Sequence, residues 1–132
     1  MLLSNLIKIL KTDTALNTLL GERIYPVRLP QDVRMPAMCI NRINDVEHGY
    51  TQQGPDHFVE SILQIDCYGE QYVQAVLAAE YTQAAIDGYK GAWNTSPVGG
   101  VFLQDARTEY EETTNIYRVS QDYRIFYGEV TE

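Results

Sequence analysis

The sequence predicts an α+β fold in the order α-β-β-α-β-β, with a mainly antiparallel sheet, two helical segments packed on one face and long projecting hairpins. Three observations predict this class. Apolar residues recur at helical spacing in residues 2–20 and 70–87. Residues 58–68 and 116–127 alternate apolar and polar residues, as half-buried strands do. Polar linkers join the strands in pairs, which favours antiparallel hairpins with helices on one side.

The first helical segment has a break in its middle. Apolar residues at helical spacing run from Leu2 to Leu10, and Asp13 then resembles a helix N-cap. Leu16, Leu19 and Leu20 continue the pattern, and Gly21 is a typical helix stop. The pattern fits either one helix broken near residues 11–14 or two short helices. Residues 23–26 then leave the helix in an extended conformation, because the residue before a proline avoids the helical region.

The first pair of strands flanks a long polar segment. Ala37–Ile43 is the first predicted strand, and Asn44–His57 is a connecting loop or hairpin tip that contains Gly49, Gly54 and Pro55. The second strand, Phe58–Tyr68, alternates between two faces. Its predicted core face carries Val59, Leu63, Ile65 and Cys67, and its predicted wet face carries Glu60, Gln64 and Asp66.

The second helix is predicted over Glu70–Asp87, with Gly88 ending it. Val101–Asp105 starts the third strand, and a polar, acidic turn region, Thr108–Asn115, precedes the last strand, Ile116–Tyr127. Apolar and tyrosine side chains share one face of the last strand: Tyr117, Val119, Tyr123, Ile125 and Tyr127. We expect Leu63, Ile65, Val119 and Ile125 to be core residues.

Two of these strands are unusually long for a small domain. A strand of eleven or twelve residues spans about 36–40 Å, whereas a typical strand spans about 17–20 Å. In a chain of 132 residues, expected to form a single domain over residues 1–132, such strands extend past the core. The hairpins they form are therefore predicted to project as docking arms.

Charge and hydropathy exclude several classes of function. The net charge of −8 argues against a surface that grips the phosphate backbone of nucleic acid, which requires clustered Lys and Arg. No apolar run approaches the roughly 20 residues that span a bilayer. Residues 1–11 lack a leading basic region and contain Lys8 and Lys11, so they do not resemble a signal peptide. These features predict a cytosolic place of assembly and no membrane partner.

The two cysteines, Cys39 and Cys67, lie in apolar, strand-like stretches. Without an export signal, they are expected to be reduced and buried. A disulfide between neighbouring strands is the alternative. Two isolated cysteines offer too few ligands for a metal site.

Candidate chemistry in the sequence is sparse. His48 and His57 share a polar loop with Glu47 and Asp56 and could form a surface metal site, but their spacing matches no metal motif. Gly99-Gly100 precedes a strand, whereas loops that cradle phosphate lead from a strand into a helix. We therefore expect no metal and no cofactor.

Carboxylates cluster in the predicted turn region, at Asp105, Glu109, Glu111 and Glu112. A general acid needs burial or a charged partner to shift its pKa, and this segment is predicted to be solvated. The cluster therefore indicates a soluble hairpin tip, and no catalytic residue is predicted.

Tyrosine is the one unusual count, with ten in the chain. Tyrosines provide large amphipathic contact surfaces and are enriched at protein interfaces, although many also fill sheet faces. We expect the polar segments Asn44–His57 and Asp105–Asn115 to be contact elements. The residues predicted to make protein contacts are Tyr50, Tyr110, Glu111 and Glu112.

The ordered set of elements resembles the phage tail-completion family, which includes the tail terminators and tail-to-head joining proteins of long-tailed phages. Each stretch alone is ordinary strand and turn chemistry, and the order of the set carries the likeness. The stretches are Leu19–Pro26, Pro36–Ile40, Leu63–Gly69 leading into the helix that ends Ile86–Gly88, and Val101–Leu103 through Arg107, Tyr110 and Glu111 to Ile116–Tyr127. Asn44–His57 does not align with the family pattern.

The resemblance implies a structural virion protein with no catalytic residues to carry over and no cofactor. It implies a hexameric ring of identical subunits at the end of the tail tube. The ring would end tube growth and present a surface to the head connector, so the implied partners are the tail tube protein and the head connector or neck proteins. DNA would pass through without specific binding, which suits an acidic channel wall. The implied location is the virion tail, assembled in the host cytoplasm.

Two other functions remain open from the sequence. One is another ring protein of the same particle, such as a head-completion or connector protein. The other, from a different class, is a small ligand-binding or enzymatic α+β domain with a pocket between helix and sheet. Convergent buried polar residues would favour that second alternative, and the sequence pattern offers none.

Overall fold

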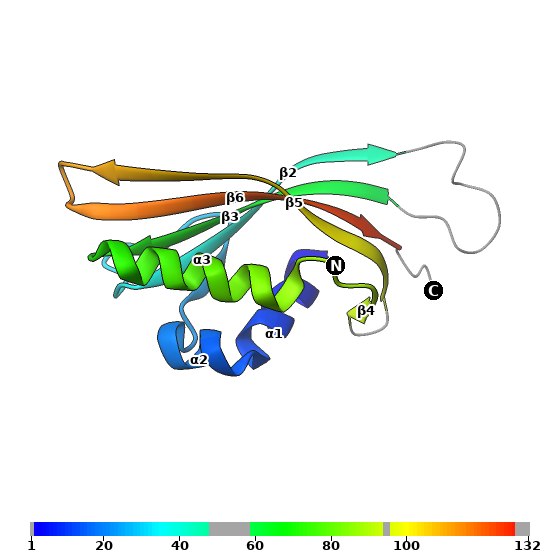
Figure 1. The fold of residues 1–132 in the computed structure, drawn as a ribbon, viewed down its shortest axis with the longest axis horizontal. Helices are drawn as coiled ribbons and strands as arrows, with labels where there is room; N and C mark the ends of the chain where they lie inside the picture. Colours follow the sequence, from blue (N-terminus) through cyan, green and yellow to red (C-terminus); the bar gives the residue numbers. More distant parts are fainter. Residues whose placement is uncertain (1, 48–58, 94–95, 129–132) are drawn as a thin grey trace.

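A computed structural model describes residues 2–47, 59–93 and 96–128 of the chain. Three helices lie on one side of a long twisted sheet (Figure 1). The strand order across the sheet is β1-β2-β3-β6-β5-β4. The elements in chain order are α1 (Leu2–Thr12), α2 (Thr14–Leu20), β1 (Ile24–Pro26), β2 (Ala37–Glu47), β3 (Val59–Gly69), α3 (Tyr72–Ile86), β4 (Gly91–Trp93), β5 (Ser96–Glu111) and β6 (Ile116–Tyr127). The predicted α+β class is confirmed.

The break in the first helical segment separates two short helices, α1 and α2. Asp13 lies between them as the N-cap of α2, and its Oδ2 accepts a hydrogen bond from the Leu16 N–H at 3.1 Å. Gly21 ends α2 with a φ of 59°, a conformation that glycine adopts without a Cβ clash. The apolar stripe of both helices is fully buried, at Leu2, Leu6, Leu10, Leu16 and Leu20.

Helix α3 packs across β3 and β6 and covers the middle of the sheet (Figure 1). Gln71 caps its N-terminus in a capping box with Gln74. The turn before it is tight, because a Cβ on Gly69 would lie 2.7 Å from the Gln74 Cβ and 3.0 Å from the Ala75 nitrogen. Glycine at position 69 therefore allows the strand to pass directly beneath the start of the helix.

The core lies on the helix-facing side of the sheet. In both long strands the side chains predicted to face the core do so. Leu63 and Ile65 of β3 are fully buried, as is Ile125 of β6, and Val119 is 6% exposed. The side chain of Val59 lies outside the described residues. The face opposite the helices, here called the open face, carries the residues that alternate with these.

Two strands of the structure are not among the predicted elements. β1 runs parallel to β2, and β4 runs antiparallel to β5, each over three residues. The extended conformation predicted for residues 23–26 agrees with β1, but neither segment was predicted as a strand, because so short a strand has no periodicity of its own. β2 also continues to Glu47, so residues 44–47 of the predicted loop belong to a strand. Residues 48–57 of that loop lie outside the described residues.

The predicted bounds of the strand that corresponds to β5 were wrong. The sequence places a strand at Val101–Asp105 and a loop at Asp105–Asn115, whereas β5 extends over Ser96–Glu111 and the turn occupies residues 112–115. Pairing with β6 continues through Glu111 and Ile116. In the second half of β5 charged residues alternate with Ala106, Thr108 and Tyr110, but every residue from Asp105 to Glu111 is exposed, so no buried apolar face marks this segment as a strand.

Both cysteines are free and buried, as expected. Burial raises the pKa of the Cys39 thiol to about 11 and that of the Cys67 thiol to about 12, and the negative charge of Asp66 adds to both shifts. At neutral pH both thiols are therefore protonated and poor nucleophiles.

Candidate functional site

The most exposed part of the described chain is the hairpin of β5 and β6. Every residue from Asp105 to Glu111, and every residue of the turn 112–115, is exposed. We call residues 105–115 the arm. It forms one end of the molecule, beyond the first turn of α3 (Figure 1). β6, which carries the arm, is instead held between β3 and β5 and beneath α3.

The arm brings together three of the four predicted contact residues. Tyr110 is 47% exposed, and its hydroxyl donates a hydrogen bond to Asn115 Oδ1 at 2.7 Å. Glu111 ends β5, and Glu112 begins the turn, both exposed. Tyr50, the fourth, lies outside the described residues.

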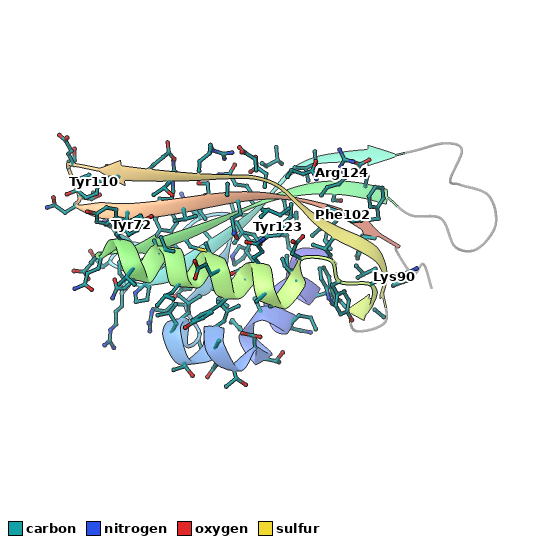
Figure 2. All side chains as sticks on the ribbon, in the orientation of Figure 1. Tyr72, Lys90, Phe102, Tyr110, Tyr123 and Arg124 are labelled. Carbon is teal, nitrogen blue, oxygen red and sulfur yellow. The ribbon has the colours of Figure 1, made fainter. Side chains whose placement is uncertain are left out.

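An aromatic cluster connects the arm to α3. The rings of Tyr110 and Tyr117 lie 4.6 Å apart, and the rings of Tyr117 and Tyr72 meet edge to face at 5.8 Å. Figure 2 shows Tyr72 and Tyr110 at the same end of the molecule. Tyr72 is 54% exposed and its neighbour Val73 is 52% exposed, so this cluster offers apolar surface to a partner. The sequence indicates Tyr72 only as a helix residue, because its pairing with Tyr117 is a tertiary contact.

A pocket of about 350 Å³ lies on the other side of the arm. The loop between β1 and β2 forms one wall, and the arm with the adjoining ends of β3 and β6 forms the other. Its lining residues are Leu29, Met35, Tyr68, Glu109, Tyr110, Glu111, Thr114, Ile116 and Arg118. Apolar and aromatic side chains form just over half of this lining, and one arginine and two carboxylates are among the rest. The apolar and aromatic part of this lining can receive an anchoring side chain of a protein partner, and the volume also lies within the range of small-ligand pockets.

Charged residues on the open face neutralise one another. Arg107 Nη1 lies 2.6 Å from Asp105 Oδ2 and 3.1 Å from Asp122 Oδ2. These two carboxylates raise the pKa of Arg107. Along the same strands, Arg118 pairs with Glu109, whose pKa is lowered by that hydrogen bond. An arginine held by carboxylates is a poor ligand for phosphate.

Two carboxylates on this face are buried, although the sequence pattern places them on the solvent-facing side of their strand. Glu60 is 8% exposed and its Oε2 lies 2.8 Å from Arg124 Nε. Asp66 is 4% exposed and accepts a hydrogen bond of 2.6 Å from the Ser120 hydroxyl. Gln64 Nε2 donates a further hydrogen bond to Asp66 at 2.9 Å. The expectation of solvated carboxylates at these positions was wrong, because neighbouring strands supply partners that the sequence of one strand cannot indicate.

The open face also carries an apolar patch away from the arm. Phe102 is 48% exposed and its ring meets that of Phe126 edge to face at 6.1 Å. Gly100 makes room for this pair, since a Cβ there would lie 2.8 Å from the Phe102 ring. The sequence predicts a turn at Gly99-Gly100, and this prediction was wrong. In the structure Gly100 lies within β5, where the aromatic ring covers it.

The described residues offer contact surfaces and little chemistry. No group of three or more His, Cys, Asp or Glu residues that could hold a metal ion occurs within residues 2–47, 59–93 and 96–128. His48 and His57 lie outside these ranges. The carboxylates of the arm face solvent or pair with arginine, so their arrangement suits docking. No described helix is long and apolar enough to cross a membrane.

Comparison with known proteins gives one family and one similar fold. The family model described as "Tail completion protein gp17" matches residues 4–128, which confirms the predicted tail-completion family. A chain from a structure described as "Virion of native gene transfer agent (GTA) particle" superposes with a TM-score of 0.72 at 14% identity, covering 94% of this chain and 92% of that chain. At this identity the second match shows a shared fold. A search of curated proteins found no match.

Proposed function

We propose that this chain, which belongs to the tail completion protein gp17 family, forms a ring at the end of a phage tail tube, ends tube growth and docks the tail to the head connector. Membership of this family makes the chain a structural protein of the virion tail. The ring, its hexameric state and its two partners, the tube protein and the connector or neck proteins, are the proposed part.

The observation that carries the proposal is the arm. Residues 105–115 are exposed throughout, yet the arm has a defined shape because β6 anchors it beneath α3. Its surroundings supply what a specific contact needs, an aromatic cluster on one side and a partly apolar pocket on the other. Such an element can reach a neighbouring subunit or the tube while its charged residues keep the free subunit soluble.

The charge pattern supports passage of DNA without retention. The chain carries a net charge of −8, and Arg107, Arg118 and Arg124 on the open face each pair with a carboxylate. Binding of phosphate by any of these arginines would first break an ion pair. A channel lined by such a surface repels DNA and leaves it free to slide.

The pocket bears on the alternative of a ligand-binding or enzymatic domain. That alternative expects a pocket between helix and sheet with convergent buried polar groups. The pocket described above lies instead between the β1–β2 loop and the arm, and its arginine, Arg118, already pairs with Glu109. These features favour a protein side chain as occupant. A connector or head-completion ring would use the same surfaces, and the partner bound by the arm distinguishes it.

Charge reversal on the arm tests the docking role. Phage carrying Glu111→Lys and Glu112→Lys are compared with phage carrying Glu22→Lys and Glu80→Lys, a double reversal at exposed positions on the helical side that also breaks the surface ion pair of Glu22 with Lys11 at 3.5 Å. Exposed carboxylates contribute little to stability, so both proteins should fold normally. We expect the arm variant to give tails of variable length or tails without heads in electron micrographs.

The control reversal should leave tail length and head joining unchanged. Normal particles from the arm variant would show that the arm is passive and would move the docking role to the helical face. Equal defects in both variants would point to net charge as the cause. Ring formation itself is measured by the solution mass of the native protein and by negative-stain images of the free protein and of purified tail tubes capped with it. A monomer in both settings would contradict the proposed ring.

A further inference from the structure

The outer edge of β5 changes in character halfway along the strand. Near its start the edge is covered: the Gly88 N–H donates a hydrogen bond to the Val101 carbonyl at 2.8 Å, and the Leu103 N–H donates one to Asp87 Oδ1 at 3.0 Å. A β-bulge follows Leu103. Beyond it, no strand in the described part of the chain pairs with the outer side of Asp105–Glu111. This segment, the β5 free edge, also lacks the Pro and Lys residues that usually protect exposed edges.

The backbone groups that point outward from the β5 free edge follow from the pairing. Residues of an antiparallel strand bond alternately to one neighbour and to the other. The backbone groups of Val101 and Leu103 point outward, so those of Phe102 bond to β6. Arg107 and Glu109 pair with β6 residues that lie an even number of positions from the partner of Phe102, so their backbone groups also bond to β6. The N–H and C=O groups of Ala106, Thr108 and Tyr110 therefore point away from the sheet.

The opposite margin of the sheet has the same design. The start of β2 is covered, because the Met38 N–H donates a hydrogen bond to the Arg23 carbonyl and the Val27 N–H donates one to the Ile40 carbonyl, each at 2.9 Å. From Asn41 to Glu47, no strand within the described ranges lies on this side. We call Asn41–Glu47 the β2 free edge.

The register of β2 with β3 gives the outward groups of the β2 free edge. Met38 and Ile40 bond outward, and the alternation continues to the bulge between Arg42 and Asn44. Past the bulge, the pairing with β3 places the backbone groups of Asp45 and Glu47 on the outer side.

The two free edges match in length and direction. Each has seven residues, 41 to 47 and 105 to 111. β2 and β5 run antiparallel, because each strand in the series β2, β3, β6 and β5 is antiparallel to the next. The free edges start in the same row across the sheet, where Asn41, Gln64, Asp122 and Asp105 are neighbours, and extend from it in opposite directions.

We infer that the β5 free edge of one copy pairs antiparallel with the β2 free edge of the next copy, so that the sheet continues from subunit to subunit. When the outward-pointing backbone N–H and C=O groups of the two edges are placed opposite one another, Thr108 of one copy faces Asp45 of the next, and Ala106 faces Glu47. The inference rests on the proposed ring and identifies the contact that builds it. Two different edges on opposite margins make a head-to-tail contact, which repeats until the ring closes. Pairing of two β5 edges would instead end at two copies.

This pairing shifts neighbouring copies along the strands by about six residues, or roughly 20 Å. In a closed sheet such a stagger is taken up by tilting the strands relative to the ring axis, as in β-barrels. Because the starts of β2 and β5 are already covered within the subunit, only one segment at each margin of the sheet is left to pair with the next copy.

Proline at an outward-facing position tests the pairing without disturbing the ladder inside the subunit. Thr108→Pro removes an outward N–H from the β5 free edge, and Asp45→Pro removes one from the β2 free edge. Thr108→Ala and Asp45→Ala, which keep the N–H, are the matched controls. Circular dichroism and urea unfolding confirm that each variant folds. Assembly is measured by solution mass and negative stain, free and on tail tubes, under the conditions in which the native chain forms rings.

The two alanine variants should form rings, and each proline variant alone should stay monomeric. A mixture of Thr108→Pro and Asp45→Pro should give a species of twice the chain mass and no ring, because each variant keeps one intact edge of a different kind. Dimers of Asp45→Pro alone would establish β5–β5 pairing and overturn the inference. Rings of either proline variant would overturn it too, while leaving the proposed function intact. Absence of rings from the native chain would contradict the proposed function itself.

A cross-link gives a second test for the case in which a proline variant fails to fold. Directly opposed Cα atoms about 5.5 Å apart allow a disulfide. The double variant Thr108→Cys with Asp45→Cys should therefore give, on oxidation of rings, a covalent ladder up to the full ring, and neither single variant should. The native Cys39 and Cys67 are buried and do not compete. Covalent dimers from Thr108→Cys alone, or no ladder from intact rings of the double variant, would refute the pairing.

Discussion

Truncation of Ile65 tests the phase of the central strand. Ile65 is fully buried on the helix-facing side of β3, between Ile40 of β2 and Gln121 of β6. Ile65→Ala removes buried carbon atoms from a position enclosed by strands on both sides, so the cavity can collapse only in part. We expect a loss of about 2–5 kcal/mol in the free energy of unfolding. With a urea slope of about 1.5 kcal/mol/M, the unfolding midpoint falls by about 1–3 M.

Ile62→Ala is the matched control, because Ile62 lies in the same strand on the open face and is only partly buried. Removing it should cost about 1 kcal/mol, since it loses less apolar burial and leaves no enclosed cavity. Both variants are unfolded in urea with the slope compared against the native protein. Equal losses for the two variants, or a larger loss for Ile62→Ala, would refute the assignment of Ile65 to the core face.

Three further predictions concern local contacts. Ser120→Ala should lower the free energy of unfolding by about 1–3 kcal/mol in urea titration, because it removes a hydrogen bond from the buried carboxylate of Asp66; a neutral result would mean that solvent replaces the hydroxyl. Cys39 and Cys67, with thiol pKa values of about 11 and 12, should react slowly with maleimide at pH 8, and rapid labelling of the native protein would contradict their burial. The free energy of unfolding should fall as pH rises above about 9, because there the thiols ionise only in the unfolded state. Gly69→Ala should destabilise the start of α3, since its Cβ meets helix atoms at 2.7 Å, and a melting temperature like that of the native protein would show that the turn can shift.

Much of the fold could be predicted because its signals are local. Asp13 and Gly21 mark the break and the end of the first helices through their own hydrogen bonds and backbone angles. The alternation in β3 and β6 reports which side chains face the core, so Ile65 and Ile125 were placed correctly. Of the candidate site, Tyr110 was named because tyrosines are enriched at protein interfaces and this one lies in a polar segment, and its contact role stays a prediction.

Other parts could not be predicted because their signals lie in another element. Asp66 is buried through Ser120, which is 54 residues away in sequence, and Tyr72 joins the arm through Tyr117. The second half of β5 was predicted as a loop because its residues alternate only between charged and uncharged and present no apolar face, so that only the ladder with β6 makes it a strand. The pocket likewise combines residues from three separate segments.

The sequence by itself therefore determined the class of fold, the phase of the long strands and the polarity of the arm, because side-chain burial imposes periods of 2 and 3.6 residues on any element that packs against a core. Only the tertiary structure decided which strand edges are covered and which are free. Whether the N–H of Thr108 or Leu103 has a partner depends on the distant Asp87 and on the strand order of the sheet, and backbone hydrogen bonds leave no mark on the identity of the residues that make them.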